Sequence, residues 1–117
     1  MNLFLILALL QIKHWYIDFV NQSEAEVKGK AIYGNWEGLG HSIKHGSASA
    51  IIFSFFYTLE IAFILGLIDF ITHYHIDWAK MNWGNRDIRT PAFWNHLGLD
   101  QMAHQLVYIG LICLLVI

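Results

Sequence analysis

Apolar residues dominate four long stretches of the chain, and polar connections separate most of them. The stretches cover residues 1–20, 39–58, 60–80 and 97–117. Each is close to the roughly 20 mainly apolar residues that a membrane-spanning helix needs. The second and third stretches follow one another directly, so we predict a tight turn near Tyr57–Ile61. One unbroken helix over both would be about 60 Å long, roughly twice the hydrocarbon thickness of a bilayer.

Two polar connections divide the remaining stretches. The first, residues 21–38, is polar and contains glycine, and the second covers residues 81–95. In the second, Thr90–Pro91 predicts the N-cap and first position of a short helix, Ala92–Leu97, which Gly98 would end. We therefore expect an all-α fold with one domain over residues 1–117, an integral membrane four-helix bundle.

The composition supports a membrane protein. Hydrophobic residues make up 56% of the 117 residues and charged residues only 14%, against about 25% charged in a typical soluble domain. One Cys and one Pro exclude a disulfide framework and a Cys-based zinc finger. The net charge of -2 offers no electrostatic footprint for nucleic acid. The N-terminal stretch lacks the basic region and cleavage site of a signal peptide, so we expect a retained helix.

The basic residues predict the orientation. They all lie in or beside the first and third connections: Lys13, Lys28, Lys30, Lys44, Lys80, Arg86 and Arg89. By the positive-inside rule these connections are cytoplasmic, and both termini are non-cytoplasmic. We expect the protein in the lipid bilayer of a bacterial inner membrane. Association with a second copy or with a membrane partner subunit is compatible with four short helices.

Ionisable residues recur inside the apolar stretches at a spacing of four. The pairs are His14 and Asp18, His41 and His45, Asp69 and His73, His73 and Asp77, and Asp100 and His104. A spacing of i, i+4 places both side chains of a pair on one face of a helix. In an up-down-up-down bundle the pairs share one level, with Asp69 about one turn deeper. The sequence therefore predicts a polar His/Asp layer near the cytoplasmic face.

Histidine nitrogen and carboxylate oxygen are ligands suited to a divalent metal, with zinc favoured and iron or manganese as alternatives. Helix bundles build such sites from facing helices. The candidate ligands are His14, Asp18, His41, His45, Asp69, His73, Asp77, Asp100 and His104. Metal ions activate water, which predicts hydrolysis of a phosphoester or amide near the lipid headgroups. Asp77 or Asp100 would serve as the catalytic general base.

Structural roles compete with these assignments. Asp100 could cap the last helix after Gly98, and Asp18 could pair with Lys13. His75 and His96 lie off the shared face or in a connection, and we exclude them. Unpaired charge inside a membrane is nonetheless costly, which favours a metal site over packing alone. The small residues of 46–50 predict close approach between two helices.

The motifs also carry a family resemblance. They read His14, Asp18 and Phe19 with Gln22; His45 or His41; Asp69, His73, Asp77 and Lys80; and Asp100, Gln101 and His104. This pattern resembles a family of phage and bacterial four-helix membrane proteins built on a domain of unknown function. Gln22 follows Asp18 by four residues, whereas the family pattern has three. More distantly, the chain is similar to LexA-regulated inner-membrane proteins regarded as metal-dependent hydrolases. The resemblance implies membrane insertion and metal binding.

Two other classes of function remain open from the sequence. Histidines on several helices are typical of haem proteins, and a di-iron carboxylate oxidase would use a related ligand set. In the third class the His/Asp layer is a metal-stapled structural network in a non-enzymatic membrane or phage accessory protein.

Overall fold

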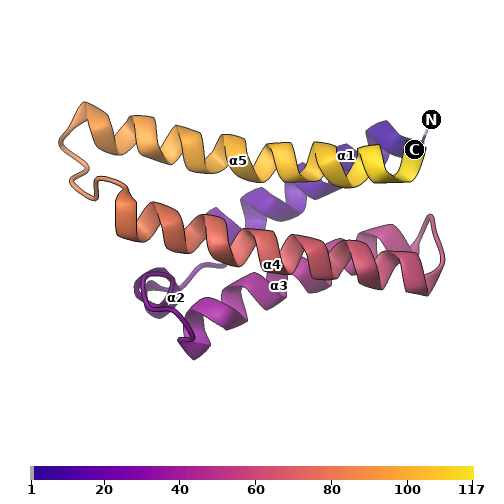
Figure 1. Ribbon diagram of the computed structural model, residues 1–117, viewed down its shortest axis with the longest axis horizontal. Helices are drawn as coiled ribbons and strands as arrows, with labels where there is room; N and C mark the ends of the chain where they lie inside the picture. The colour runs from indigo at the N-terminus through magenta and orange to yellow at the C-terminus, as the bar shows by residue number, and fades with distance from the viewer. Residues whose placement is uncertain (1) are drawn as a thin grey trace.

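The computed structural model describes residues 2–117, which are almost entirely helical. They form α1 (Asn2–Trp15), the π-helical turn η1 (Tyr16–Val20), α2 (Glu24–Gly29), α3 (Trp36–Ser54), α4 (Leu59–Trp83) and α5 (Pro91–Val116). The four longer helices lie along the long axis of the molecule, and the short α2 lies at one end (Figure 1). No strand occurs in this part of the chain, so the predicted all-α class is confirmed.

Polar side chains begin the helices after each connection. Asn35 accepts hydrogen bonds from the backbone at the start of α3, and Thr58 and Thr90 do so for α4 and α5. The predicted turn between the second and third helices exists, but it covers residues 55–58 and so lies about two residues earlier. Thr90 as N-cap and Pro91 in the first turn are both confirmed.

The last helix corrects one expectation. Gly98 does not end a short helix, because α5 runs without a break from Pro91 to Val116. A single glycine inside a helix costs only about 1 kcal/mol relative to alanine, which the packing of a long helix outweighs. The first connection likewise holds more structure than we expected, since it contains α2, which Ser23 caps.

The end of the first helix departs from regular α geometry. The Asn21 N–H donates to the carbonyl of Tyr16 at 2.8 Å, a bond that spans five residues instead of four. This π-helical turn holds Ile17 and Asp18 buried. Such turns are rare and frequent at functional sites. The sequence pattern alone predicted a regular helix here.

Helices α3 and α4 pack closely because glycines meet at their crossing. A Cβ atom added to Gly46 would lie 2.7 Å from the carbonyl oxygen of Gly66, and one added to Gly66 would lie 2.7 Å from the Cβ of Ala50. No side chain larger than hydrogen fits at either glycine without a shift. The predicted close approach along residues 46–50 is therefore confirmed.

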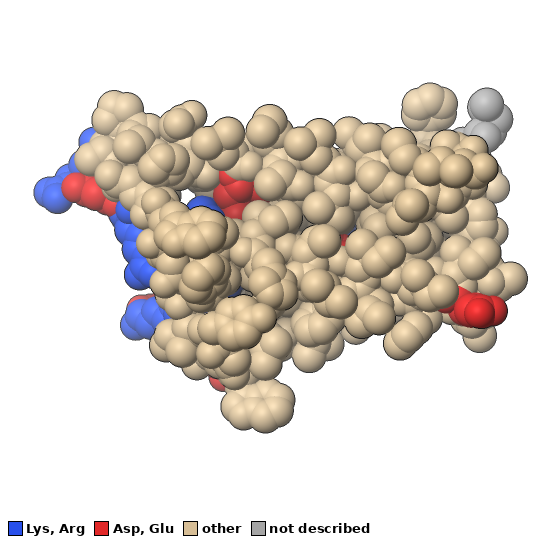
Figure 2. Space-filling view, viewed as in Figure 1, with Lys and Arg blue, Asp and Glu red and all other residues tan. Residues whose placement is uncertain are grey.

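Three helical stretches are long and apolar enough to cross a membrane: Asn2–Val20, Leu59–Trp83 and Pro91–Val116. Helix α3 is not among them, so three of the four expected membrane-spanning helices are supported. Its glycines, serines and histidines lower the mean hydropathy of the helix. Most of the visible surface consists of uncharged side chains (Figure 2).

The interior of the bundle has an apolar half and a polar half. The apolar cluster contains Ile6, Leu10, Phe53, Ala62, Leu65, Tyr108 and Leu111. It lies toward the end that holds both termini and the α3–α4 turn (Figure 1). Between this cluster and α2 the buried side chains are mostly ionisable.

Candidate metal centre

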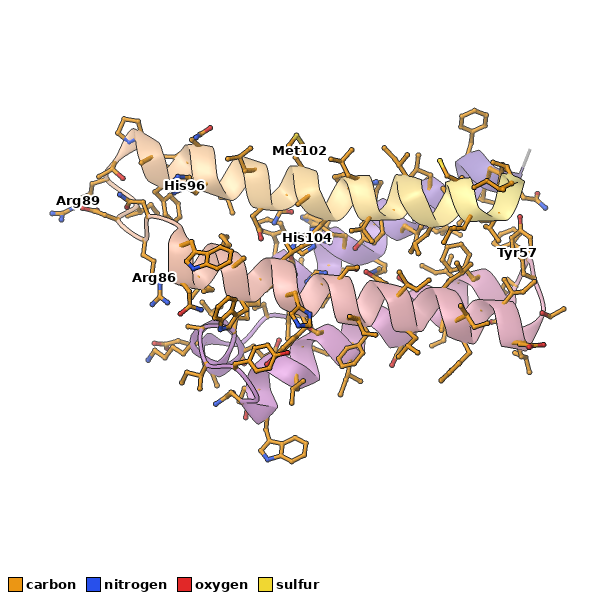
Figure 3. The ribbon with its side chains drawn as sticks, viewed as in Figure 1. Tyr57, Arg86, Arg89, His96, Met102 and His104 are labelled. Atoms are coloured by element: carbon orange, nitrogen blue, oxygen red, sulfur yellow. The ribbon has the colours of Figure 1, made fainter. Side chains whose placement is uncertain are left out.

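Four helical segments bring ionisable side chains to one buried region, which we call the polar layer. Its central members are Asp18 from η1, His41 and His45 from α3, His73 and Asp77 from α4, and Asp100 and His104 from α5. Each is at most 6% exposed. His104 points from α5 toward α4 in the interior of the bundle (Figure 3). From the i, i+4 spacing we expected such side chains to share one helix face and one level of the bundle, and these seven residues are arranged in this way.

The first group of candidate ligands surrounds Asp18. The Nε2 atoms of His41 and His45 lie 2.9 Å and 2.8 Å from Asp18 Oδ1. His73 Nε2 is 3.6 Å from the same oxygen. One carboxylate oxygen thus faces three imidazoles, and the four side chains could together hold a metal ion.

The second group shares His73 with the first and surrounds Asp77. His73 Nε2 lies 3.1 Å from Asp77 Oδ2, and His104 Nε2 lies 3.1 Å from Asp77 Oδ1. These three side chains could also hold a metal ion. Asp100 Oδ1 is 3.4 Å from His104 Nε2 and adds a carboxylate at the edge of the group.

The second group contains buried polar atoms without a hydrogen-bond partner. They are both ring nitrogens of His73, Oδ2 of Asp77 and Oδ1 of Asp100. His73 and Asp77 are close, but their atoms are not aligned for a hydrogen bond. Leaving such a group unsatisfied costs about 1–3 kcal/mol. A cation among these atoms would satisfy several of them at once.

The spacing of the donor atoms also fits a metal ion. Zinc binds nitrogen and oxygen ligands at about 2.0–2.2 Å, which places neighbouring ligand atoms roughly 3.0–3.5 Å apart. In the second group the closest nitrogen–oxygen separations are 3.1, 3.1 and 3.4 Å. These separations fit a divalent cation, although the His104–Asp77 contact at 3.1 Å is also a hydrogen bond that the cation would replace.

The charge of the polar layer favours a cation as well. Asp69 pairs with Lys13, and Glu26 pairs with Lys44. The three remaining carboxylates, those of Asp18, Asp77 and Asp100, face one ammonium group, that of Lys30, which is 3.5 Å from Asp77. Carboxylates and ammonium groups alone leave an excess of two negative charges, which a divalent cation, or protonated histidines such as His104 between Asp77 and Asp100, would neutralise.

Glu26 of α2 supports His41 from outside the first group. Its Oε2 lies 2.9 Å from His41 Nδ1, while His41 Nε2 faces Asp18. A carboxylate on the far nitrogen is the usual partner of a metal-ligating histidine, because it fixes the orientation of the ring. Burial raises the pKa of Glu26, but hydrogen bonds from Lys44 and His41 outweigh burial and hold the pKa below its usual range.

Two predicted ligands, His14 and Asp69, lie beside the two groups and have other partners. Asp69 accepts a hydrogen bond from Lys13 at 2.8 Å. His14 lies 2.8 Å from the Tyr108 hydroxyl through Nδ1 and 2.7 Å from Gln101 Oε1 through Nε2, and the same Nε2 is 3.2 Å from Asp18 Oδ2 of the first group. Since an amide oxygen only accepts, the His14 proton lies on Nε2 in this arrangement. His14 then orients Gln101.

A chain of hydrogen bonds continues from His14 to the second group. The Gln101 amide donates to Asp100 Oδ2 at 3.0 Å. This contact occupies one Asp100 oxygen and leaves Oδ1 directed at His104. Asp100 is therefore held by Gln101, and no cap of a separate last helix is needed to explain it, because α5 begins at Pro91.

Two lysines of the polar layer were not predicted from the sequence. Lys13 and Lys30 were grouped with the cytoplasmic basic residues, yet they are only 8% and 6% exposed. Lys13 binds Asp69 and not Asp18. Its position inside an apolar stretch was the available signal, because intramembrane ionisable residues face the bundle interior. Nothing in the local sequence marks Lys30, which reaches Asp77 from the connection after α2.

Comparison with known proteins identifies the family. The family described as "Protein of unknown function (DUF3307)" matches residues 5–117. The chain belongs to this family. The match includes every residue of both metal-ligand groups. No curated protein and no solved structure matches the chain. The expected family of unknown function is thus found, while the further resemblance to phage and LexA-regulated proteins has no support from the match.

Proposed function

We propose that the protein is a membrane-embedded metal-dependent hydrolase whose divalent cation, zinc in the first instance, binds at His73, Asp77 and His104. The observation that carries the proposal is the set of unpartnered atoms at His73, Asp77 and Asp100, which are buried together. Lys30, 3.5 Å from Asp77 Oδ2, compensates only part of this set, whereas a divalent cation would partner the atoms of all three residues.

The second group suits catalysis better than the first. Asp100, at the edge of this group, lines a cavity of about 330 Å³ between α4 and α5, and its Oδ1 lies 3.4 Å from His104 Nε2, so the group would be approached through Asp100. In the first group Asp18 Oδ1 already faces His41 and His45 at hydrogen-bond distance. Catalytic metal sites keep an open coordination position, while structural sites are closed.

Asp100 is the residue placed to handle a proton. Its Oδ1 has no hydrogen-bond partner, and Gln101 holds the other oxygen. A general base must lie within reach of the water it deprotonates. Asp100 lines the cavity but its Oδ1 is buried, so water would reach this oxygen after a small movement of the side chain. A divalent metal at the neighbouring group supplies Lewis-acid activation when bound. The bonds that would suit this arrangement are phosphoesters and amides.

The surrounding membrane is part of the proposal. All four longer helices would cross a bacterial inner membrane, with both termini on the non-cytoplasmic side. Support comes from Lys and Arg, which gather at the end formed by α2 and the α4–α5 connection (Figure 2). The opposite end carries Glu60 in the first turn of α4. Helix α3 could cross the bilayer despite its polar residues, because its polar face is turned into the bundle and away from lipid.

Metal analysis of the detergent-purified protein tests the proposal. We expect about one to two equivalents of zinc, iron or manganese in the wild type and at most a small fraction of that in His73→Ala. His75→Ala is the matched control, since His75 lies on the same helix but bonds Tyr33 and the Ile71 carbonyl. A folded wild-type protein that takes up no metal on reconstitution would refute the proposal.

The hydrolytic step needs its own test. Asp100→Asn keeps the size of the side chain but removes the base and one negative charge beside the metal ligands. We therefore compare activity per bound metal, and expect hydrolysis of phosphoester or amide substrates by the metal-loaded variant to be lower by about 100-fold. Inactivity of the metal-loaded wild type on both substrate panels would argue against hydrolysis and leave the metal site intact.

A structural network is the second candidate function. The specific observation in its favour is that buried lysines already lie beside both groups, with Lys13 Nζ 3.1 Å from His45 Nδ1 and Lys30 Nζ 3.5 Å from Asp77. A metal that never exchanges would favour this reading. A haem is disfavoured because the imidazole rings stack directly on one another and leave no space for a porphyrin between them. The His73 ring centroid lies 3.6 Å from that of His45 and 4.0 Å from that of His104.

A further inference from the structure

Two adjoining cavities form a groove between α4 and α5, which we call the α4–α5 groove. The first cavity, about 330 Å³, reaches Asp100 and has apolar walls that include Ile76 and Leu99. The second, about 390 Å³, extends toward α2 and includes Lys28 and Arg86 in its lining. Lys80 and His96 line both cavities, so the two cavities adjoin at these side chains, and the first cavity also reaches Asp100 of the polar layer.

The outer part of the groove suits an anion. Lys28, Lys80, Arg86 and His96 line the second cavity, and no carboxylate is among its described lining residues. Lys28 pairs with Glu24 at 2.9 Å and the Arg86 guanidinium donates to the Met81 carbonyl, so Lys80 and His96 are the groups left to bind an anion. His96 Nδ1 accepts a hydrogen bond from the Asn85 N–H at 2.8 Å, so its Nε2 carries a proton and can donate. Arg86 and His96 lie at the same end of the α4–α5 pair, while Arg89 extends away at the tip (Figure 3).

The inner part of the groove suits a hydrocarbon chain. Ile76 and Ala79 of α4 face Leu99 and Ala103 of α5 across the first cavity. Both helices are apolar and long enough to cross a membrane, so this wall would adjoin lipid. A ligand that fits both parts carries a negative charge at one end and an apolar chain at the other.

We propose that the α4–α5 groove binds a phosphate-bearing lipid, with the phosphate at Lys80 and His96 and an acyl chain along Ile76 and Leu99. This inference rests on the proposed hydrolase function and names its substrate class. His96 and Asp100 are four residues apart, about 6 Å along α5. A lipid held this way places the bonds next to its phosphate beside Asp100. Charge-assisted hydrogen bonds from basic side chains are the usual means of binding phosphate.

Equilibrium binding to the detergent-solubilised full chain tests the inference. Three probes separate the two parts of the ligand: short-chain dihexanoyl phosphatidylglycerol, dihexanoylglycerol without phosphate, and glycerol 3-phosphate without chains. We expect the first to bind at least about tenfold more tightly than either of the others. The double variant Lys80→Gln/His96→Gln should lose about tenfold in affinity for phosphatidylglycerol.

Arg89→Gln is the matched control. Arg89 is equally basic and lies at the same end, but it pairs with Asp87 at 3.0 Å and does not line the groove. Equal losses in Arg89→Gln and in the double variant would overturn the site, leaving only general charge attraction. Dihexanoylglycerol binding as tightly as phosphatidylglycerol would overturn the phosphate contact, and glycerol 3-phosphate doing so would overturn the lipid.

Failure here is distinguishable from failure of the proposed function. Binding is measured with and without bound metal and needs no turnover. The double variant leaves His73, Asp77 and His104 unchanged, so its metal content should equal that of the wild type and also reports that it is folded. Unchanged lipid affinity with normal metal content would refute the groove and leave the metal centre standing.

Discussion

The ion pair between Lys13 and Asp69 illustrates how single residues stabilise the polar layer. Lys13 Nζ donates to Asp69 at 2.8 Å and to the Tyr108 hydroxyl at 3.0 Å. Asp69 also accepts from Ser49. These partners come from α1, α3, α4 and α5, so the pair joins all four longer helices at the border with the apolar cluster. Buried charges are tolerated only with such partners.

Removing one member of this pair should destabilise the protein strongly. Lys13→Met leaves Asp69 as a buried carboxylate without a counter-ion, and we expect the free energy of unfolding to fall by about 3–5 kcal/mol. Denaturant unfolding in detergent measures the change. Lys13→Met with Asp69→Asn should recover a large part of it, because no net charge then remains buried.

A surface pair provides the comparison. Lys28 and Glu24 form an i, i+4 pair at 2.9 Å with side chains 75% and 82% exposed. Lys28→Met should therefore change the free energy of unfolding by less than about 1 kcal/mol. Similar losses in Lys13→Met and Lys28→Met would contradict the burial argument.

At the scale of the helices, two backbone features aim the candidate ligands. The π-helical turn at Tyr16–Val20 places Asp18 between His41 and His45 of α3. The glycine contact between α3 and α4 draws His45 and His73 together, with ring centroids 3.6 Å apart. Small residues let helix backbones approach in a membrane, where packing replaces the hydrophobic effect as the driving force.

Enlarging a glycine at this contact should separate α3 from α4. A Cβ at Gly46 would lie 2.6 Å from that of Phe70, so Gly46→Ala must shift one helix. We expect a loss of about 1–3 kcal/mol in the free energy of unfolding and reduced metal content. Gly110→Ala is the control, since nothing lies within 4 Å of its added Cβ. It should be neutral or slightly stabilising.

At the scale of the whole molecule, apolar and polar side chains are distributed between surface and interior in the reverse of the way found in a soluble domain. Large apolar side chains such as Phe4, Phe63 and Leu106 are more than half exposed, while five histidines and four aspartates are buried. The molecule is 43 Å along its longest axis, compared with about 30 Å for the hydrocarbon core of a bilayer. The basic end therefore has room to extend beyond the hydrocarbon.

Labelling of single cysteines tests the proposed orientation. In a Cys113→Ser background, Glu60→Cys should react with a membrane-impermeant maleimide in intact spheroplasts, because the α3–α4 turn would be non-cytoplasmic. Arg89→Cys should react only in inverted vesicles. The reverse pattern would place the polar layer toward the other face, and reaction of both from one side would contradict a spanning bundle.

Much of the fold and part of the site could be predicted from the sequence because both depend on local periodicity. Apolar stretches of about 20 residues located the longer helices, and the spacing of four placed His73 and Asp77 on one face. The helix end predicted at Gly98 does not exist, and the turn predicted near Tyr57 lies about two residues earlier, since tertiary packing overrides the weak preferences of single residues.

What the sequence determined by itself is that the chain is helical and apolar and that its histidines and aspartates share a level. Only the tertiary structure decided how they divide into two groups around Asp18 and Asp77, and that Lys13 and Lys30 join them. The physical reason is that spacing fixes the face of one helix. The rotation of each helix against its neighbours depends on contacts between residues far apart in the chain, such as Gly46 with Gly66.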